Sequence, residues 1–478
     1  MDAFATITKL KQQLASGELS AQELLSSVIK RFEKHDARIG SALEIFSQDS
    51  LNAEATSQGP LAGIPGLIKD NISQKGRKLT CASKILEHFV ATYDATAVSR
   101  LKESGALLIG RANMDEFAMG SSTETSAFLK TRNPWDTSRV PGGSSGGSIA
   151  AVAAGLVPWS LGSETGGSVR QPAAFCGIVG LKPTYGLVSR YGLVAYASSL
   201  DQIGIATRTV EDNALVLSQI AGQDIHDSST LPVEKKDYTR SLGQMPKVRI
   251  GIVENALYAE GMDSEVVRVI EQALGEFEQL GVQLVKIKIP SMDYSAAAYF
   301  IISRAEAASN LARFDGIRYG SRSDAQSLQE VYQKTRHDGF GAEVKSRILI
   351  GNYVLSAGYA DAYYNKARAV QGMIRHEFSQ AFKDVDLLLM PTQSAPAFEF
   401  GAYDVDKLKM DLQDYFTCPI NLAGLPALSL PCGFTSKGLP LGLQLVGPHL
   451  GEELIFQVAH AYEQRTPWHT MHPKELDL

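Results

Sequence analysis

Two short segments built almost entirely of glycine and serine constrain the fold of this chain more than any other feature. Residues 142–148 read GGSSGGS, and residues 162–168 read GSETGGS. Apolar runs follow both segments, at residues 149–161 and 173–181, so we expect both to be held inside the fold. Buried backbone polar groups need partners, and glycine lets a loop aim its N–H groups at one point. We therefore interpret the two segments as parts of a site and not as a flexible linker.

The patterns around these segments predict an α/β fold with one large mixed sheet covered by helices on both faces. Residues 248–253 and 282–289 alternate in polarity, and residues 265–280 between them have helical periodicity, which predicts two parallel strands joined by a right-handed crossover. Gly281 stands where a helix often ends in a left-handed glycine. We expect a single domain over residues 1–478.

Within that domain we expect a core at about residues 60–210 and a polar excursion at about 223–247. Local signals predict a helix that opens with a capping box at Ser20–Glu23 and a helix that Asp94 caps and that ends at Gly105. The apolar run at residues 149–161 predicts a buried helix. Further predicted elements are strands at 67–69, 106–109, 386–390 and 439–446 and a closing helix at 452–464.

Composition excludes several classes of protein. The 478 residues are 44% hydrophobic and 21% charged, as in a globular protein with a core. Their net charge of −6 disfavours a chain that binds nucleic acid by itself. The four cysteines lie far apart without metal-ligand spacing, which is typical of buried thiols in a reducing compartment. No apolar run approaches the ~18 residues of a membrane helix, and the N-terminus does not resemble a signal peptide. We expect a cytoplasmic protein without membrane contact.

A serine nucleophile needs a base, and lysine is the best candidate here. Ser144 and Ser145 each fit the G-x-S-x-G pattern of a nucleophile elbow, but none of the nine histidines is a convincing partner. No cluster of His, Cys, Asp or Glu has ligand spacing, so we expect no metal site. Burial can lower the pKa of a lysine from ~10.4 by up to ~3–5 units. Lys69 ends the apolar run 67–69, although an arbitrary lysine is more often a solvated surface residue.

The same segments closely resemble the amidase signature family. The matching stretches are residues 142–148, 162–170 (GSETGGSVR) and 171–177 (QPAAFCG). The family's Ser-cisSer-Lys triad maps onto Ser168, Ser144 and Lys69, with the family spacing of 24 residues between the serines. Glu164 and Val169 depart slightly from the common pattern and leave the triad untouched.

The resemblance also implies further site residues. It assigns the oxyanion hole to the backbone N–H groups around Thr165, Gly166 and Gly167, beside Ser168. It implies that Arg347 holds the α-carboxylate of glutamine, that Asp414 holds the α-ammonium and that Tyr299 lines the pocket. By themselves, Arg347 could lie on a solvated helix face and Tyr299 in the core. Two more residues lie in matching segments, where they touch the substrate or support the triad: Thr123 and Ser145.

Residues 113–120, 181–186 and 312–320 are similar to the branch of the family that serves tRNA-dependent amidotransferases. The resemblance implies glutaminase chemistry, with ammonia passed to a partner subunit that converts Glu-tRNA(Gln) to Gln-tRNA(Gln). It implies a heterotrimer with two other subunits, in which tRNA is bound mainly by the partner. It also implies no cofactor in this chain, with ATP and magnesium used in the partner subunit.

Two other readings stay open from the sequence. One is a stand-alone amidase acting on other carboxamides, which would not need the charges of Arg347 and Asp414. The other is a catalytically silent scaffold, which an intact triad disfavours. The sequence leaves open whether Asp-tRNA(Asn) is also served.

Overall fold

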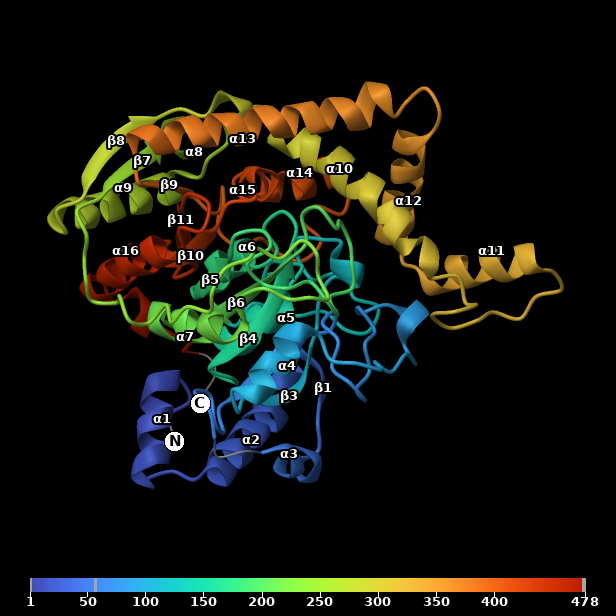
Figure 1. Ribbon diagram of the computed structural model, residues 1–478, viewed down its shortest axis with the longest axis horizontal. Helices are drawn as coiled ribbons and strands as arrows, with labels where there is room; N and C mark the ends of the chain where they lie inside the picture. The colour runs from blue at the N-terminus through green and yellow to red at the C-terminus, as the bar shows by residue number, and fades with distance from the viewer. Residues whose placement is uncertain (1, 56–57, 475–478) are drawn as a thin grey trace.

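The computed structural model describes residues 2–55 and 58–474, and across them eleven strands form one continuous mixed sheet (Figure 1). The order across the sheet is β1-β3-β2-β4-β6-β5-β10-β11-β9-β7-β8. Strand β2 pairs in parallel with β3 and β4, β7 pairs in parallel with β8 and β9, and the strands between these groups pair antiparallel. The strands are β1 Ala42–Ile45, β2 Pro65–Lys69, β3 Leu107–Ala112, β4 Trp159–Glu164, β5 Val179–Lys182, β6 Gln202–Thr207, β7 Arg249–Val253, β8 Gln283–Ile287, β9 Leu387–Pro391, β10 Ala427–Phe434 and β11 Pro440–Val446.

Helices cover both faces of this sheet. Helices α5 and α6 pack against each other and on the central strands, while α7, α9 and α16 pack on the opposite face. The helices of the first half are α1 Ile7–Ser16, α2 Ala21–Ile39, α3 Gln48–Glu54, α4 Thr96–Glu103, α5 Gly146–Ala153, α6 Arg170–Cys176 and α7 Val210–Ile220. Those of the second half are α8 Glu254–Leu257, α9 Ser264–Gln279, α10 Ser295–Asn310, α11 Leu328–Gly339, α12 Ala342–Leu355, α13 Lys366–Asp384, α14 Lys407–Asp411, α15 Cys418–Ala423 and α16 Glu452–Arg465.

Most predicted elements are present. Strands β7 and β8 are parallel neighbours joined through α9, and Gly281 adopts a left-handed φ of 81° just after that helix. The Ser20–Glu23 capping box forms at the start of α2. All four cysteines are free and buried. No helix within the described ranges is long and apolar enough to cross a bilayer.

Two predicted helices are wrong in part. The apolar run 149–161 is not one helix: α5 ends at Ala153, and the chain continues through Pro158 into strand β4. Proline cannot continue a helix, and the sheet takes the second half of the run. Asp94 does not cap α4. Ala95 is the N-cap residue, and the Asp94 carboxylate accepts hydrogen bonds from Lys75 N–H and from the Lys102 side chain.

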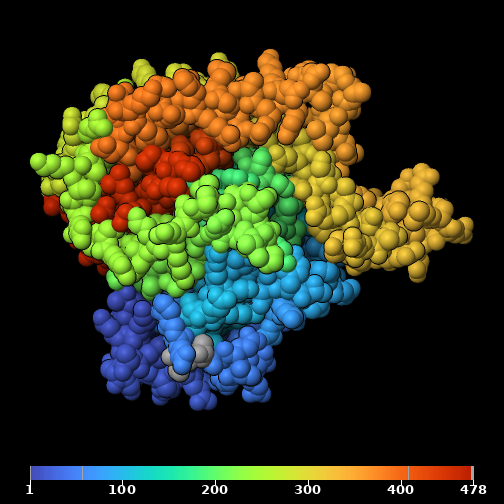
Figure 2. Space-filling view, in the orientation of Figure 1, coloured from blue at the N-terminus to red at the C-terminus, as the bar shows by residue number. Residues whose placement is uncertain are grey.

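One helical arm stands out from the body. Helix α11 projects from the side of the molecule opposite α16, as the yellow segment in Figures 1 and 2 shows. The chain returns from this arm through Gly341 into α12, and α12 packs against α10. The arm therefore leads directly to the helix pair that carries Tyr299, Arg304 and Arg347.

Candidate active site

The Lys69 ammonium group lies at the centre of the molecule, at the carboxyl end of strand β2. Its side chain is fully buried, and Nζ lies 2.8 Å from Ser144 Oγ, 2.8 Å from Ser145 Oγ and 3.0 Å from Ser163 O. All three neighbours are uncharged. Burial lowers the pKa of Lys69 to about 7, although the carboxylates of Asp115 and Glu164 act in the opposite direction.

The contacts of Nζ suit a neutral amine, which has two N–H donors and one lone pair. The Ser163 carbonyl can only accept. The Ser145 hydroxyl donates to that same carbonyl at 3.0 Å, so its oxygen is left to accept from Nζ. With both N–H groups of the neutral amine used in this way, its lone pair remains for the hydroxyl proton of Ser144.

The loop that carries Ser144 is held by the residues around it. The Gly143–Ser144 peptide bond is cis, as the resemblance implies. The Gln171 side chain accepts from Gly143 N–H at 3.1 Å, and Asp115 N–H donates to Ser144 O at 3.1 Å. Thr123 Oγ1 donates to Gly142 O at 2.8 Å and accepts from Gly146 N–H at 3.1 Å. The structure thus places Thr123 as a support of this loop.

Ser168 lies between β4 and α6, on the second glycine-serine segment. Its carbonyl accepts from Ser145 N–H at 3.1 Å, which joins the two segments. Within the described residues, no oxygen accepts from the N–H groups of Gly166, Gly167 or Ser168. Gly167 has a φ of +149°, and a Cβ there would lie 2.1 Å from Thr417 Oγ1, so only glycine fits this turn. Donors without partners, converging near a hydroxyl, are what an oxyanion hole requires.

A buried ion pair braces that loop from behind. Arg170 and Glu164 are both fully buried at the side chain and lie 2.7 Å apart. Glu164 also accepts from the N–H groups of Val169 and Arg170, each at 3.2 Å. The Arg170 guanidinium donates further to Gln444, Asn421 and Thr417 O. This pair fixes the two ends of the loop that bears Ser168.

Tyr299, Arg347 and Asp414 converge in front of the loop. Tyr299 Oη lies 2.7 Å from Thr165 Oγ1, and a Cβ on Gly166 would meet the Tyr299 ring at 2.6 Å. Asp414 Oδ1 lies 3.1 Å from where a Cβ on Gly167 would stand, and Ser121 donates to Asp414 Oδ2 at 3.2 Å. Burial raises the pKa of Asp414 to about 8. Arg347 is 7% exposed, so the solvated alternative is wrong for this residue.

A cavity of about 430 Å³ opens beside these residues. Its wall includes Ser121, Arg304, Glu343, Arg347 and Asp411. Ser121 joins this cavity to Asp414, and therefore to the loop with the unused N–H groups.

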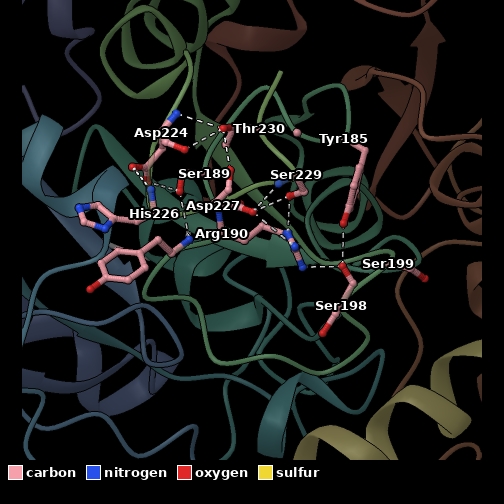
Figure 3. Close-up of polar contacts among 12 residues, drawn as sticks. Tyr185, Ser189, Arg190, Ser198, Ser199, Asp224, His226, Asp227, Ser229 and Thr230 are labelled. Carbon is pink, nitrogen blue, oxygen red and sulfur yellow. Dashed lines mark hydrogen bonds and ion pairs between the residues drawn. The ribbon is translucent and has the colours of Figure 1, made fainter. Parts of the chain in front are cut away.

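The loop that supplies Tyr196 to Arg347 is anchored by a polar cluster. Tyr196 Oη accepts from Arg347 Nη1 at 2.7 Å. Figure 3 shows how the neighbouring stretch is fixed: Arg190 N–H donates to Asp227, and Ser189 donates to Asp224. These two aspartates belong to the polar excursion predicted at 223–247. That excursion has no strand or helix in the structure, but it holds the loop that positions Arg347.

Comparison with known proteins fits this geometry. The family model described as Amidase matches residues 23–456. The chain belongs to the amidase family. It is 52% identical over 481 residues to the glutamyl-tRNA(Gln) amidotransferase A subunit of Cyanothece sp., across 98% of this chain and 100% of the relative. The corresponding protein of Picosynechococcus sp. is 50% identical, again across 98% of this chain and 100% of the relative.

Solved structures agree on the fold. The glutamyl-tRNA(Gln) amidotransferase A subunit of Thermotoga maritima has a TM-score of 0.84 at 41% identity, across 98% of this chain and 97% of that one. The 6-aminohexanoate cyclic dimer hydrolase has a TM-score of 0.88 at 28% identity, across the whole of both chains. The fold alone therefore does not determine which amide is the substrate; the residues of the pocket do.

Some residues of this amidase site were not predicted. Asp115 accepts from the N–H groups of Ser122, Thr123 and Thr125, and thereby shapes the loop beneath Ser144. Glu164 was noticed only as a departure from the family pattern. Nothing in the sequence singled out Arg304 and Asp411, because they are 107 residues apart and meet only in the fold.

Proposed function

We propose that this chain is the glutaminase subunit of a tRNA-dependent amidotransferase. The observation that carries the proposal is the fully buried Lys69, 2.8 Å from Ser144 and beside a loop with unused N–H groups. Asp414 lies against this loop and accepts a hydrogen bond from Ser121, which shares a cavity wall with Arg347. A lysine whose pKa is near 7 can accept a proton at neutral pH. The high identity to curated amidotransferase subunits supports glutamine as the substrate.

In the proposed reaction Ser168 Oγ attacks the side-chain amide carbon of glutamine and forms the new C–O bond. The Ser168 proton passes to the Ser144 hydroxyl, while Ser144 gives its own proton to Lys69 Nζ. The oxyanion is bound by the N–H groups around Thr165, Gly166, Gly167 and Ser168, each worth roughly 3–4 kcal/mol. The proton returns through Ser144 to the leaving nitrogen as the C–N bond breaks, and ammonia departs. Water then hydrolyses the acyl-serine to glutamate.

The charged groups of the pocket fit the two α-substituents of glutamine. The planar Arg347 guanidinium suits the α-carboxylate, and the Asp414 carboxylate suits the α-ammonium. Tyr299, which contacts Thr165 and Gly166, lines the pocket in this proposal. Ser145 acts on the triad itself, because its hydroxyl occupies one N–H group of Lys69.

Ammonia released into solvent would be lost, so the proposal includes partner subunits. A second subunit would use the ammonia, ATP and magnesium to convert Glu-tRNA(Gln) to Gln-tRNA(Gln), and a small third subunit would complete a heterotrimer in the cytoplasm. The net charge of −6 suits a chain whose tRNA contact lies mainly in the partner. The isolated chain should have weak glutaminase activity, and strong turnover without tRNA would contradict this part of the proposal.

A substrate panel tests the function. The chain, alone and with its co-purified partners, is assayed for ammonia release from glutamine, an aliphatic amide and an aryl amide. We expect preference for glutamine in kcat/KM. Preference for a neutral hydrophobic amide would instead identify a stand-alone amidase, and no turnover of any amide would identify a scaffold.

A further inference from the structure

Two residues outside the expected site form an ion pair in the wall of the cavity. Arg304 on α10 donates from Nη2 to both Asp411 oxygens, at 3.0 and 3.1 Å. The Arg304 side chain is 4% exposed and lies on the Phe300 ring, with the guanidinium carbon 3.1 Å from its centroid. Both residues belong to the cavity wall. The arginine is therefore fixed in place, and it holds the carboxylate of the shorter, more exposed α14.

Asp411 also stands next to Arg347. Asp411 Oδ1 lies 3.9 Å from Arg347 Nη2, close enough for an ion pair but too far for a hydrogen bond. The other guanidinium nitrogens of Arg347 are engaged, Nε with Glu343 at 2.7 Å and Nη1 with Tyr196 Oη at 2.7 Å. Among the described residues, no atom accepts a hydrogen bond from Nη2. The Nη2 group of Arg347, which has no hydrogen-bond acceptor among the described residues, faces the carboxylate that Arg304 holds.

We propose that Arg304 is a specificity-determining positioning residue: it retains Asp411, so that the Arg347 Nη2 edge stays open for the carboxylate of a substrate. This inference rests on the proposed glutaminase function and deepens it. Without Arg304, Asp411 would move the short distance to Arg347 and become an internal competitor of the α-carboxylate. Charge-assisted hydrogen bonds between guanidinium and carboxylate are strong enough for this competition to matter.

The arrangement selects a class of substrate. Arg347 offers a cation edge, and Asp414 Oδ1 is a buried oxygen with no hydrogen-bond partner among the described residues. Arg347 can therefore bind an anion, and Asp414 can accept a hydrogen bond from a donor. An amide that carries a free α-carboxylate and an α-ammonium can bind to both groups. Binding of an amide without the carboxylate does not depend on where the Arg304–Asp411 pair holds Asp411.

The test compares Arg304→Gln, Asp411→Asn and the double variant in the full chain. In R304Q we expect KM for glutamine to rise roughly tenfold or more, the effect of losing a hydrogen bond to a charged group, with kcat within about threefold of wild type. The Kd of glutamine, measured calorimetrically in a Ser168→Ala background, should weaken by the same factor. In the double variant, KM should return to within about threefold of wild type, because the competing carboxylate is gone. R304K, which keeps the cation, should resemble wild type.

The controls separate positioning from general destabilisation. R240Q breaks an exposed ion pair with Asp237 and should change nothing. The kcat/KM for 4-aminobutanamide, which lacks the α-carboxylate, should be unaffected by R304Q. Equal losses for both amides, or a double variant no better than R304Q, would overturn the inference. If R304Q does not fold, D411N alone decides: KM at or below wild type supports the inference, and a clear rise contradicts it. Failure of the wild-type chain to hydrolyse glutamine would refute the proposed function instead.

Discussion

The surroundings of Lys69 lower the pKa of this single residue. Its three hydrogen-bonding neighbours are two hydroxyls and a carbonyl, so burial is not offset by a carboxylate in direct contact. Asp115 and Glu164 influence it only over longer distances. The side chain can therefore lose its proton near neutrality while remaining fixed on a strand.

The first prediction concerns the pH dependence of turnover. In the proposed reaction the active form of Lys69 is the neutral amine, and burial lowers the pKa of Lys69 to about 7. We expect kcat, measured at saturating glutamine, to fall about tenfold per pH unit below 7 and to level off above it. Lys69→Met should remove this limb and lower turnover by orders of magnitude while the chain stays folded. Stopped assays of ammonia release from pH 5.5 to 8.5 measure both effects, and an unchanged profile in the variant would contradict the assignment.

The second prediction concerns Asp414, whose pKa burial raises to about 8. The protonated acid must lose its proton before it can pair with an α-ammonium group. The affinity for glutamine should therefore weaken as the pH falls below 8, by up to about tenfold per unit. Calorimetric titration of glutamine into the Ser168→Ala chain should show this trend and a release of protons on binding. Asp414→Asn should bind weakly at every pH, and a pH-dependent affinity in that variant would assign the titration to another group.

At the scale of elements, the loop between β4 and α6 depends on the Glu164–Arg170 pair. Both side chains are buried, and together they contact the loop, α15 and β11. Removing one member of such a pair leaves a charge in the interior without compensation.

We therefore expect Arg170→Met to destabilise the fold by about 3–5 kcal/mol and to abolish labelling of Ser168. Arg240→Met, at an exposed ion pair, should change stability by less than about 0.5 kcal/mol. Urea denaturation followed by circular dichroism provides the comparison. Equal stability of the two variants would show that the buried pair does not brace the loop.

The elements also show what the sequence could and could not predict. Periodicity predicted the β7–α9–β8 unit, because its strands and helix each bury one regular face. The run at 149–161 was misread because residues buried on all sides look alike in a helix and in a central strand. Only Pro158 indicated that the helix ends within this run, and the apolar character of the residues could not show at which residue it ends. Lys69 could be proposed from its local context, but the Arg304–Asp411 pair requires knowledge of how α10 meets α14.

At the scale of the whole molecule, one sheet passes through every part of the chain. The strands from β1 to β8 form an unbroken hydrogen-bonded order, and the glycine-serine segment at 162–168 begins on one of its inner strands, β4. This continuity predicts one cooperative unfolding transition. Differential scanning calorimetry should show a single endotherm, in the wild type and in Ser168→Ala alike. Two separable transitions would instead divide the chain into independent domains.

The central claim is that Ser168 is acylated with Lys69 as the base, acting through Ser144. The most direct measurement is peptide mapping by mass spectrometry after reaction with an electrophilic glutamine analogue. The account predicts one adduct, on Ser168, absent from Ser168→Ala and formed far more slowly in Lys69→Met and Ser144→Ala. An adduct on any other side chain, or unchanged labelling of Ser168→Ala, would contradict it.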